Sequence, residues 1–177
     1  LACIPEERLG RGAASGFSLR DNLFLTHHGR NLVRYGFIKY KETDERSTQV
    51  INRFSVQCDG PGAAAQSLSG GNLQRFIVGR EIDLNPTVLI ASQPTWGLDV
   101  AAAAFIRQTL IDLSRSGTAV LVFSEELEEL LEICDQIAVM YSGQMSPAVP
   151  RADADIEQIG LLMAGEGFPT HTASQGR

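Results

Sequence analysis

The spacing of apolar residues divides the chain into a mainly helical region and an α/β region. Between residues 16 and 86, apolar side chains recur at helical spacing, which predicts helices over Leu19–Leu25, Asp44–Phe54 and Asn72–Leu84. Between residues 87 and 145, short apolar runs alternate with helical patterns. The runs typical of buried strands are Val88–Ala91, Ala119–Phe123 and Ile137–Tyr141, and the helices between them are Val100–Ser116 and Glu126–Cys134. This alternation predicts a parallel α/β sheet.

Local signals set the expected boundaries of these elements. Ser18 followed by Asp21 resembles a capping box at the start of the first helix, and Thr43 is expected to cap the second. Residues 1–15 have the composition of a loop, residues 155–164 predict one more helix, and residues 166–177 a mobile tail. The expected parts of the chain are residues 1–15, 16–86, 87–145 and 146–177.

The composition favours a globular protein and argues against several functions. A length of 177 residues with 44% hydrophobic residues suffices for one domain, or for a domain with a small subdomain. The net charge of −6 argues against nucleic acid as the main partner, because phosphate-backbone binding requires clustered Lys and Arg. The cysteines and histidines stand at no metal-ligand spacing, so we expect neither a metal site nor a disulfide framework.

The segment Leu68–Asn72 has the residues of a phosphate-binding turn. Ser69, Gly70 and Gly71 stand at the start of a predicted helix, where glycines let a ligand approach the backbone and free N–H groups favour an anion. An ordinary serine cap with a glycine turn would explain these residues taken alone. The phosphate interpretation is strengthened by the residues C-terminal to this turn, which are a helix, a buried strand, then Ser92-Gln93-Pro94-Thr95 and Gly97-Leu98-Asp99.

These landmarks, in this order, resemble the C-terminal two-thirds of an ATP-binding cassette (ABC) ATPase domain. Leu68–Asn72 is similar to the family's LSGGQ signature, with Asn72 in place of the glutamine. Ser92 and Gln93 stand where the Walker B strand of the family ends in Asp-Glu. The resemblance covers residues 2 to about 146 and implies a partial P-loop NTPase (RecA-like) parallel sheet without its P-loop strand, with an inserted ABC-type helical subdomain.

Three further segments extend the resemblance. Gly97, Leu98 and Asp99 are similar to the D-loop of the family, and Glu125 occupies the position of its switch histidine. Pro5 and Glu6 lie in a segment that resembles the Q-loop region of tandem-domain importers for simple sugars and nucleosides. The chain is most similar to the second, degenerate ATPase domain of that branch, from the Q-loop onward.

The departures from the family pattern affect the catalytic positions. Ser92 is a poor partner for Mg²⁺ because its hydroxyl has no formal charge, and Gln93 can orient water but cannot accept a proton. Glu125 would repel a γ-phosphate. The chain contains no G-x-x-x-x-G-K-[ST] motif, so we expect the P-loop strand and helix upstream of Leu1. The chain alone is therefore expected to hydrolyse no ATP.

The resemblance implies a composite ATP site, with nucleotide between one domain's P-loop and the other domain's signature. It implies ATP and Mg²⁺ in the assembled protein, neither bound tightly by this chain alone. The implied partners are a second ATPase domain, expected in the N-terminal half of the same polypeptide, and the coupling helix of a membrane permease on the cytoplasmic face of the plasma membrane. Candidate liners of the groove for that helix are Phe17, Leu19, Phe24 and Tyr35.

Two other interpretations stay open. The chain could be a non-catalytic regulatory or structural ABC-like module whose signature surface binds another protein. It could also be the head of a chromosome-maintenance or DNA-repair ATPase, although such heads keep the Walker B carboxylates and carry long heptad repeats, which this sequence does not. An unpaired sheet edge would favour self-association of the chain.

Overall fold

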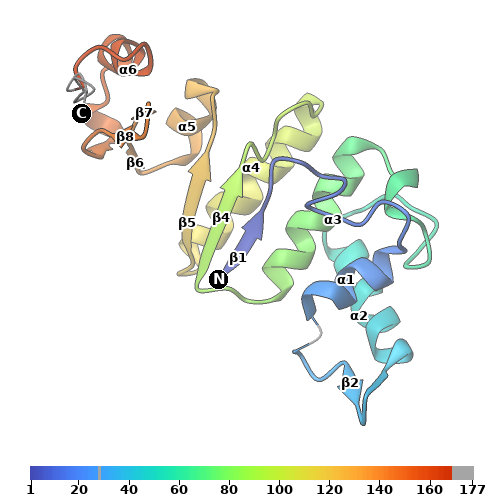
Figure 1. The fold of residues 1–177 in the computed structure, drawn as a ribbon. Coiled ribbons are helices and arrows are strands. Elements are labelled where there is room, and N and C mark those ends of the chain that lie inside the picture. The colour runs from blue at the N-terminus through green and yellow to red at the C-terminus, as the bar shows by residue number, and fades with distance from the viewer. Residues whose placement is uncertain (28, 169–177) are drawn as a thin grey trace, which may run out of the picture. The chain divides into compact units, whose positions relative to one another are not determined.

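A computed structural model describes residues 1–27 and 29–168, which form two compact units divided between Glu125 and Glu126 (Figure 1). The mobile tail expected at residues 166–177 lies, from residue 169 on, outside the described residues.

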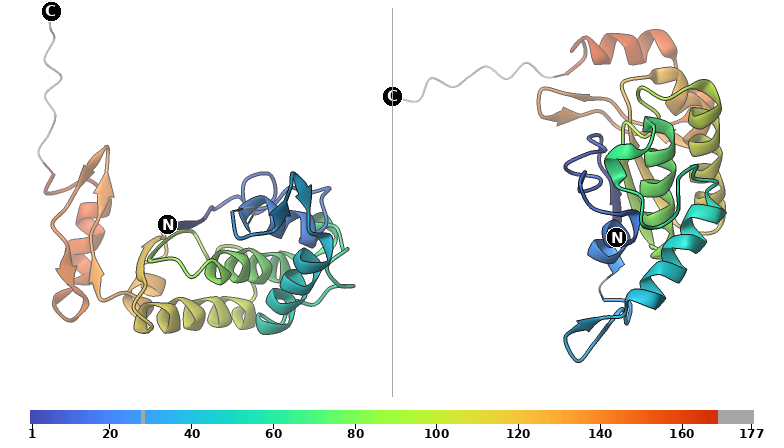
Figure 2. Two further views of the ribbon diagram at one scale, coloured as in Figure 1. Left: turned by 90° about the horizontal axis from the view of Figure 1, so that it is seen from below. Right: turned by 90° about the vertical axis from the view of Figure 1, so that its right-hand side faces the viewer.

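The first unit contains a parallel sheet of three strands in the order β1-β4-β5. The central strand β4 (Val88–Ser92) pairs with β1 (Ala2–Ile4) on one side and with β5 (Ala119–Phe123) on the other. Helices α3 (Gly70–Asp83) and α4 (Val100–Arg115) lie side by side on one face of the sheet (Figures 1 and 2). The parallel α/β arrangement expected from the sequence is confirmed for β4, α4 and β5.

The first residues of the chain form a strand, so the prediction of a loop over residues 1–15 is wrong at its start. Ala2–Ile4 pairs in register with Leu89–Ala91 of β4. A strand of three residues is too short to show a period of two in its sequence. β1 is a strand because it pairs with β4, which is remote in the sequence.

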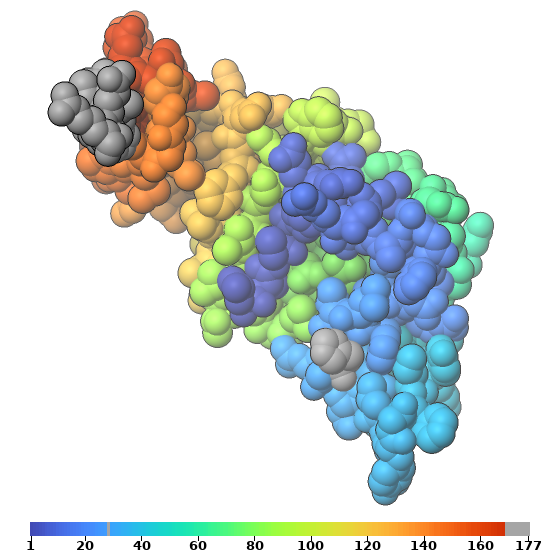
Figure 3. Space-filling model, viewed as in Figure 1, coloured from blue at the N-terminus to red at the C-terminus, as the bar shows by residue number. Residues whose placement is uncertain are grey.

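The two faces of this sheet differ in burial, because successive side chains of a strand point to opposite faces. Ile4 and Ala91, which pair across β1 and β4, are fully buried on the side of the helices. Leu121 and Phe123 of β5 belong to the other set and are 50% and 40% exposed. Figure 3 views the molecule from this second side, where β1 lies at the surface. Among the described residues, the prediction of buried strands therefore holds for the face that the helices cover and is wrong for the other face of β5.

Three helices pack together beside the sheet: α1 (Leu19–His27), α2 (Tyr40–Arg53) and α3. A short hairpin of β2 (Val33–Arg34) and β3 (Phe37–Ile38) connects α1 to α2, and a 3₁₀ turn, η1 (Ala65–Ser67), precedes α3. The buried apolar side chains shared by the three helices include Leu19, Leu23, Val50, Phe76 and Ile77. Because Leu19 is fully buried, it is a core residue and not a liner of a surface groove, whereas Phe17 and Tyr35 are exposed.

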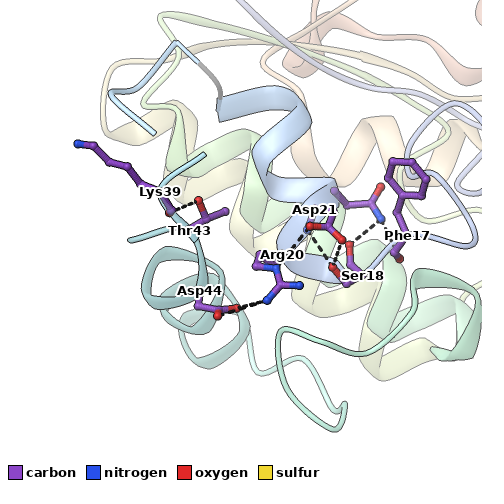
Figure 4. A network of polar contacts seen from close by, with 8 residues as sticks. Phe17, Ser18, Arg20, Asp21, Lys39, Thr43 and Asp44 are labelled. Carbon is purple, nitrogen blue, oxygen red and sulfur yellow. Dashed lines mark hydrogen bonds and ion pairs between the residues drawn. The ribbon is translucent and has the colours of Figure 1, made fainter. Parts of the chain in front are cut away.

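The starts of α1 and α2 show one correct and one wrong prediction (Figure 4). The Ser18 hydroxyl accepts from the Asp21 backbone N–H at 3.1 Å and donates to the Asp21 carboxylate at 2.6 Å, so the cap of α1 is confirmed. Thr43 is not a cap, because α2 begins at Tyr40 and the Thr43 hydroxyl donates to the Lys39 carbonyl at 2.8 Å. A threonine inside a helix bonds back to the preceding turn in this way.

The second unit begins with α5 (Leu127–Ile133) and ends, in its described part, with α6 (Ile156–Met163), and both helices confirm predictions. Between them lie four short strands in two antiparallel pairs, followed by one 3₁₀ turn. They are β6 (Gln136–Ile137) with β9 (Val149–Pro150), β7 (Met140–Tyr141) with β8 (Gln144–Met145), and η2 (Arg151–Asp153).

The predicted third parallel strand over Ile137–Tyr141 is wrong. The run is interrupted at Val139, whose backbone N–H bonds to the Ser146 hydroxyl at 2.9 Å and whose carbonyl accepts from the Ser146 N–H at 2.8 Å. Ile137, Val139 and Ile159 are instead the buried core of the second unit. None of the helices within residues 1–27 and 29–168 has both the length and the apolar composition of a membrane-spanning segment.

A polar cluster joins the ends of α1 and α3 to the middle of α2. One oxygen of Asp83 accepts from Arg46 Nε at 2.6 Å and lies 3.1 Å from Nε2 of the buried His27. Burial alone would raise the Asp83 pKa, but hydrogen bonds from His27 and Arg46 and the Arg46 charge together lower it below the ordinary value. The Asp83 carboxylate therefore stabilises the folded state most strongly in its ionised form.

We expect Asp83→Asn to lower the free energy of unfolding by about 1–2 kcal/mol at pH 7. Because folding lowers the Asp83 pKa, its contribution is complete above the pKa of the unfolded chain, about 3.9, and is lost as the pH falls through the lower folded value. Urea unfolding as a function of pH would show a constant difference from wild type down to about pH 5, which shrinks below about pH 4.

The matched control is Asp44→Asn. Asp44 forms a partly exposed ion pair with Arg20 at 3.3 Å, for which we expect less than about 0.5 kcal/mol. Equal effects of the two substitutions would contradict a special role for the polar cluster around Asp83.

Candidate functional site

The predicted signature residues form the N-terminus of α3. Ser69 has extended backbone angles and is the N-cap, and the helix begins at Gly70. Ser69 and Gly70 are exposed, whereas Gly71 and Asn72 are half-buried. Leu68 precedes the cap in an extended conformation. The first N–H groups of α3 therefore lie at the surface with the positive end of the helix dipole, an arrangement that suits an anion.

Hydrogen bonds from Asn72 fix the orientation of the Ser69 hydroxyl. The Ser69 oxygen accepts from the Asn72 side-chain Nδ2 at 3.0 Å and from its backbone N–H at 3.4 Å. Asn72 is held in turn, because its Oδ1 accepts from the Gln57 backbone N–H at 2.9 Å. A hydroxyl has two acceptor positions and one donor. With both acceptor positions occupied, the Ser69 O–H is left to donate, as a phosphate oxygen requires.

The two glycines of this turn lie against other parts of the first unit. A Cβ at Gly70 would lie 3.0 Å from Arg8 Nη1, and a Cβ at Gly71 would lie 3.2 Å from Ala102 Cβ and 3.6 Å from Asp99 Oδ2. The N-terminus of α3 therefore approaches the start of α4 closely. The fold thus brings together the predicted signature and D-loop residues.

The loop from β4 to α4 carries the second group of predicted residues. Gln93 has a φ of +47° and its N–H donates to the Phe123 carbonyl at 2.8 Å. Gly97 has a φ of +64°, which an L side chain rarely adopts. Leu98 closes a turn by donating to the Thr95 carbonyl at 3.1 Å. Asp99 is the N-cap of α4 and accepts from the Ala102 N–H at 2.9 Å.

The Q-loop-like, Walker B-like and switch-position residues all follow strands of the parallel sheet. Pro5 and Glu6 follow β1, Ser92 is the last residue of β4 and Gln93 follows it, and Glu125 comes two residues after β5. The carboxyl ends of parallel strands meet at one edge of the sheet, where α/β proteins bind ligands. No group of three or more His, Cys, Asp or Glu side chains suited to a metal ion occurs among the described residues.

Two residues at this site were not singled out from the sequence. Gln74 of α3 is 1% exposed and donates from Nε2 to the Pro94 carbonyl at 2.8 Å. Arg8 donates from Nη2 to the Trp96 carbonyl. Gln74 had a weak signal, as a polar residue between the buried positions Leu73 and Phe76, whereas no spacing pointed to Arg8.

Solved structures define the class of fold. An ABC ATPase domain solved as a dimer in a post-hydrolysis state with ADP and Pi matches with a TM-score of 0.69 at 19% identity, covering 85% of this chain and 62% of that one. A putative metal-chelate type ABC transporter in an inward-facing conformation matches with a TM-score of 0.74 at 16% identity, covering 93% of this chain and 64% of that one. The fold is therefore that of an ABC ATPase domain with its helical subdomain.

Curated relatives lead to the same family. The nucleoside import ATP-binding protein NupA of Lactococcus lactis subsp. cremoris is 39% identical over 163 residues, covering 92% of this chain and 32% of NupA. The glucose import ATP-binding protein TsgD13 of Haloferax volcanii is 37% identical over 173 residues, covering 96% of this chain and 32% of TsgD13. No protein-family model matches the chain.

The chain belongs to the ABC ATPases, among relatives that are import ATP-binding proteins for sugars and nucleosides. It spans about a third of the length of the curated relatives that it matches.

Proposed function

We propose that this chain supplies the signature half of a composite ATP site in an importer of the simple-sugar or nucleoside type. The terminal phosphate of ATP, held by the P-loop of a second ATPase domain, would lie at the N-terminus of α3. The observation that carries the proposal is the orientation of the Ser69 hydroxyl, whose oxygen accepts from Asn72 and whose proton is left to donate. Because Gly70 and Gly71 carry no Cβ, this helix N-terminus can pack against Arg8 and the start of α4 while its exposed N–H groups face a phosphate.

The residues present fit a phosphate but do not fit Mg²⁺ at the chain's own Walker B position. Ser92 and Gln93 are neutral, and a hard cation favours carboxylate oxygens. Glu125, exposed after β5, places a negative charge where a γ-phosphate would approach. We infer that the site facing this sheet is degenerate and that Mg²⁺ and the catalytic carboxylate belong to the partner domain's site.

The proposal assigns a role to each part of the chain. Residues 1–15 provide the Q-loop-like segment, 16–86 the signature subdomain, 87–145 the remaining α/β core, and 146–177 the C-terminal segment. The partner ATPase domain is proposed to be the N-terminal half of the same protein, which would sit on the inner face of the plasma membrane. A permease coupling helix would dock on the helical subdomain, where the aromatic rings of Phe17 and Tyr35 are exposed.

The test that separates the two sites is Gln93→Ala in the whole ATPase protein. If the site facing β4 is degenerate, the rate of ATP hydrolysis should stay within about twofold of wild type, because no proton acceptor is removed. Steady-state phosphate release with the purified protein measures it.

Gln108→Ala, on the exposed side of α4, is a control for loss of a surface amide. A loss of more than about tenfold for Gln93→Ala alone would assign the chemistry to this domain's own site and contradict the proposal.

A further inference from the structure

The loop between β4 and α4 is held by two side chains from different parts of the chain. Gln74, in the second turn of α3, donates to the Pro94 carbonyl at 2.8 Å. Arg8, in the segment that follows β1, donates to the Trp96 carbonyl. The two carbonyls flank the buried Thr95. The backbone that leads to Asp99 is therefore fixed to α3 on one side and to the segment after β1 on the other.

Arg8 also contacts the start of the signature helix. A Cβ at Gly70 would lie 3.0 Å from its Nη1, and a Cβ at Gly97 would lie 3.7 Å from its Nη2. The guanidinium thus lies between the N-terminus of α3 and the turn at Gly97. Its planar fork carries five N–H donors, so one side chain can face both segments at once.

The backbone that carries Arg8 is a closed turn. The Arg8 carbonyl accepts from the Ala13 N–H at 2.7 Å, and the Glu7 carbonyl accepts from the Gly12 N–H at 2.9 Å. Arg80 of α3 fixes the same turn by donating to the Gly12 carbonyl at 2.8 Å. Arg8 therefore projects from a rigid support that is itself anchored to α3.

The environment of Arg8 is unusual for a surface arginine. Among the described residues, no carboxylate lies within ion-pair distance of its guanidinium. Burial lowers the pKa of Arg8 from its ordinary value, although the side chain stays partly exposed. Within the described part of the chain, its hydrogen bond goes to the Trp96 carbonyl and not to a carboxylate, so the side chain serves the β4–α4 loop and not an ion pair.

We infer that Arg8 is a positioning residue that fixes the β4–α4 loop to the N-terminus of α3, so that Ser69 and Asp99 keep one geometry during ATP hydrolysis. Gln74 fixes the same loop through its hydrogen bond to the Pro94 carbonyl. This inference rests on the proposed function, because it assumes that the N-terminus of α3 faces a nucleotide. Arg8 acts through the loop and does not itself bind ATP.

The test uses Arg8→Met in the whole ATPase protein, since methionine keeps an apolar stem and removes every donor. We expect kcat for ATP hydrolysis to fall about tenfold or more, with the KM for ATP within about twofold, because the partner's P-loop supplies the ground-state binding while misplacement costs rate. Arg8→Lys should recover part of the rate, since one ammonium can reach the Trp96 carbonyl but cannot span both segments.

Amide hydrogen exchange without nucleotide tests the contact between Arg8 and the β4–α4 loop independently of ATP hydrolysis. In Arg8→Met, the amides of Trp96, Gly97 and Leu98 should exchange at least about fivefold faster, with those of β4 unchanged. Arg11→Met is the matched control, because Arg11 belongs to the same segment, is 79% exposed and, among the described residues, forms its ion pair with Glu7. It should change neither exchange nor kcat.

Three results would overturn the inference: unchanged exchange in the loop, unchanged kcat in Arg8→Met, or a raised KM with kcat intact, which would make Arg8 a nucleotide ligand. The failure of the proposed function is distinguishable, because Ser69→Arg would then leave hydrolysis intact, whatever the exchange of the loop amides shows.

Discussion

Ser69→Arg in the whole ATPase protein is expected to reduce ATP hydrolysis about 100-fold or more. The substitution removes the hydroxyl whose oxygen is bound by Asn72 and whose proton is left to donate. It also places a long side chain at an exposed helix N-terminus, where the proposed partner domain must approach. Loss of one preorganised donor alone costs about 10²–10³ in kcat in other enzymes. Phosphate release at saturating ATP is the measurement.

Two variants bracket this result. Ser116→Arg adds the same side chain at the opposite end of α4 from Asp99 and should keep a rate within about twofold of wild type. Ser69→Ala removes only the hydroxyl and should lie between wild type and Ser69→Arg. Full activity of Ser69→Arg, with loss of activity in Gln93→Ala, would mean that the working site is the one that faces β4.

Arg80→Ala is expected to destabilise the fold more than the other substitutions, by about 3–5 kcal/mol in the free energy of unfolding. Arg80 and Glu81 are adjacent on α3, only 4% and 5% exposed, and their side chains meet at 2.9 Å. Arg80 also donates to the carbonyls of Asn22 at 3.3 Å and Gly12 at 2.8 Å. Truncation leaves a buried carboxylate and two carbonyls without their donor. Urea unfolding measures the change.

The double variant Arg80→Met with Glu81→Leu separates charge from packing. Because it leaves no charge buried alone, it should recover more than half of the loss seen in Arg80→Ala. If the double variant is as unstable as Arg80→Ala, the effect comes from the two carbonyls and from lost packing, and the unpaired Glu81 carboxylate is not the cause.

The elements predicted correctly are those whose signals lie within a few residues of one another. Ser18 and Asp21 are three positions apart, and Ser69 and Asp99 each cap the helix that begins at the next residue. The prediction that Thr43 caps α2 is wrong because hydroxyl side chains also donate to backbone carbonyls inside helices. The sequence does not distinguish the two arrangements. The prediction of one strand over Ile137–Tyr141 is wrong because a hydrogen bond between Val139 and Ser146 interrupts the run.

Residue type and short spacing are enough to specify the family, the helix starts at Ser69 and Asp99, and the absence of carboxylates at Ser92 and Gln93. The residues that support these features are specified by tertiary contacts alone. Arg8 and the Trp96 carbonyl are 88 positions apart, and Gln74 and the Pro94 carbonyl are 20 apart. Such remote contacts leave no periodic pattern in the sequence. Every residue has a backbone carbonyl, so residue type does not mark the acceptor, and only the fold brings the donor side chain to it.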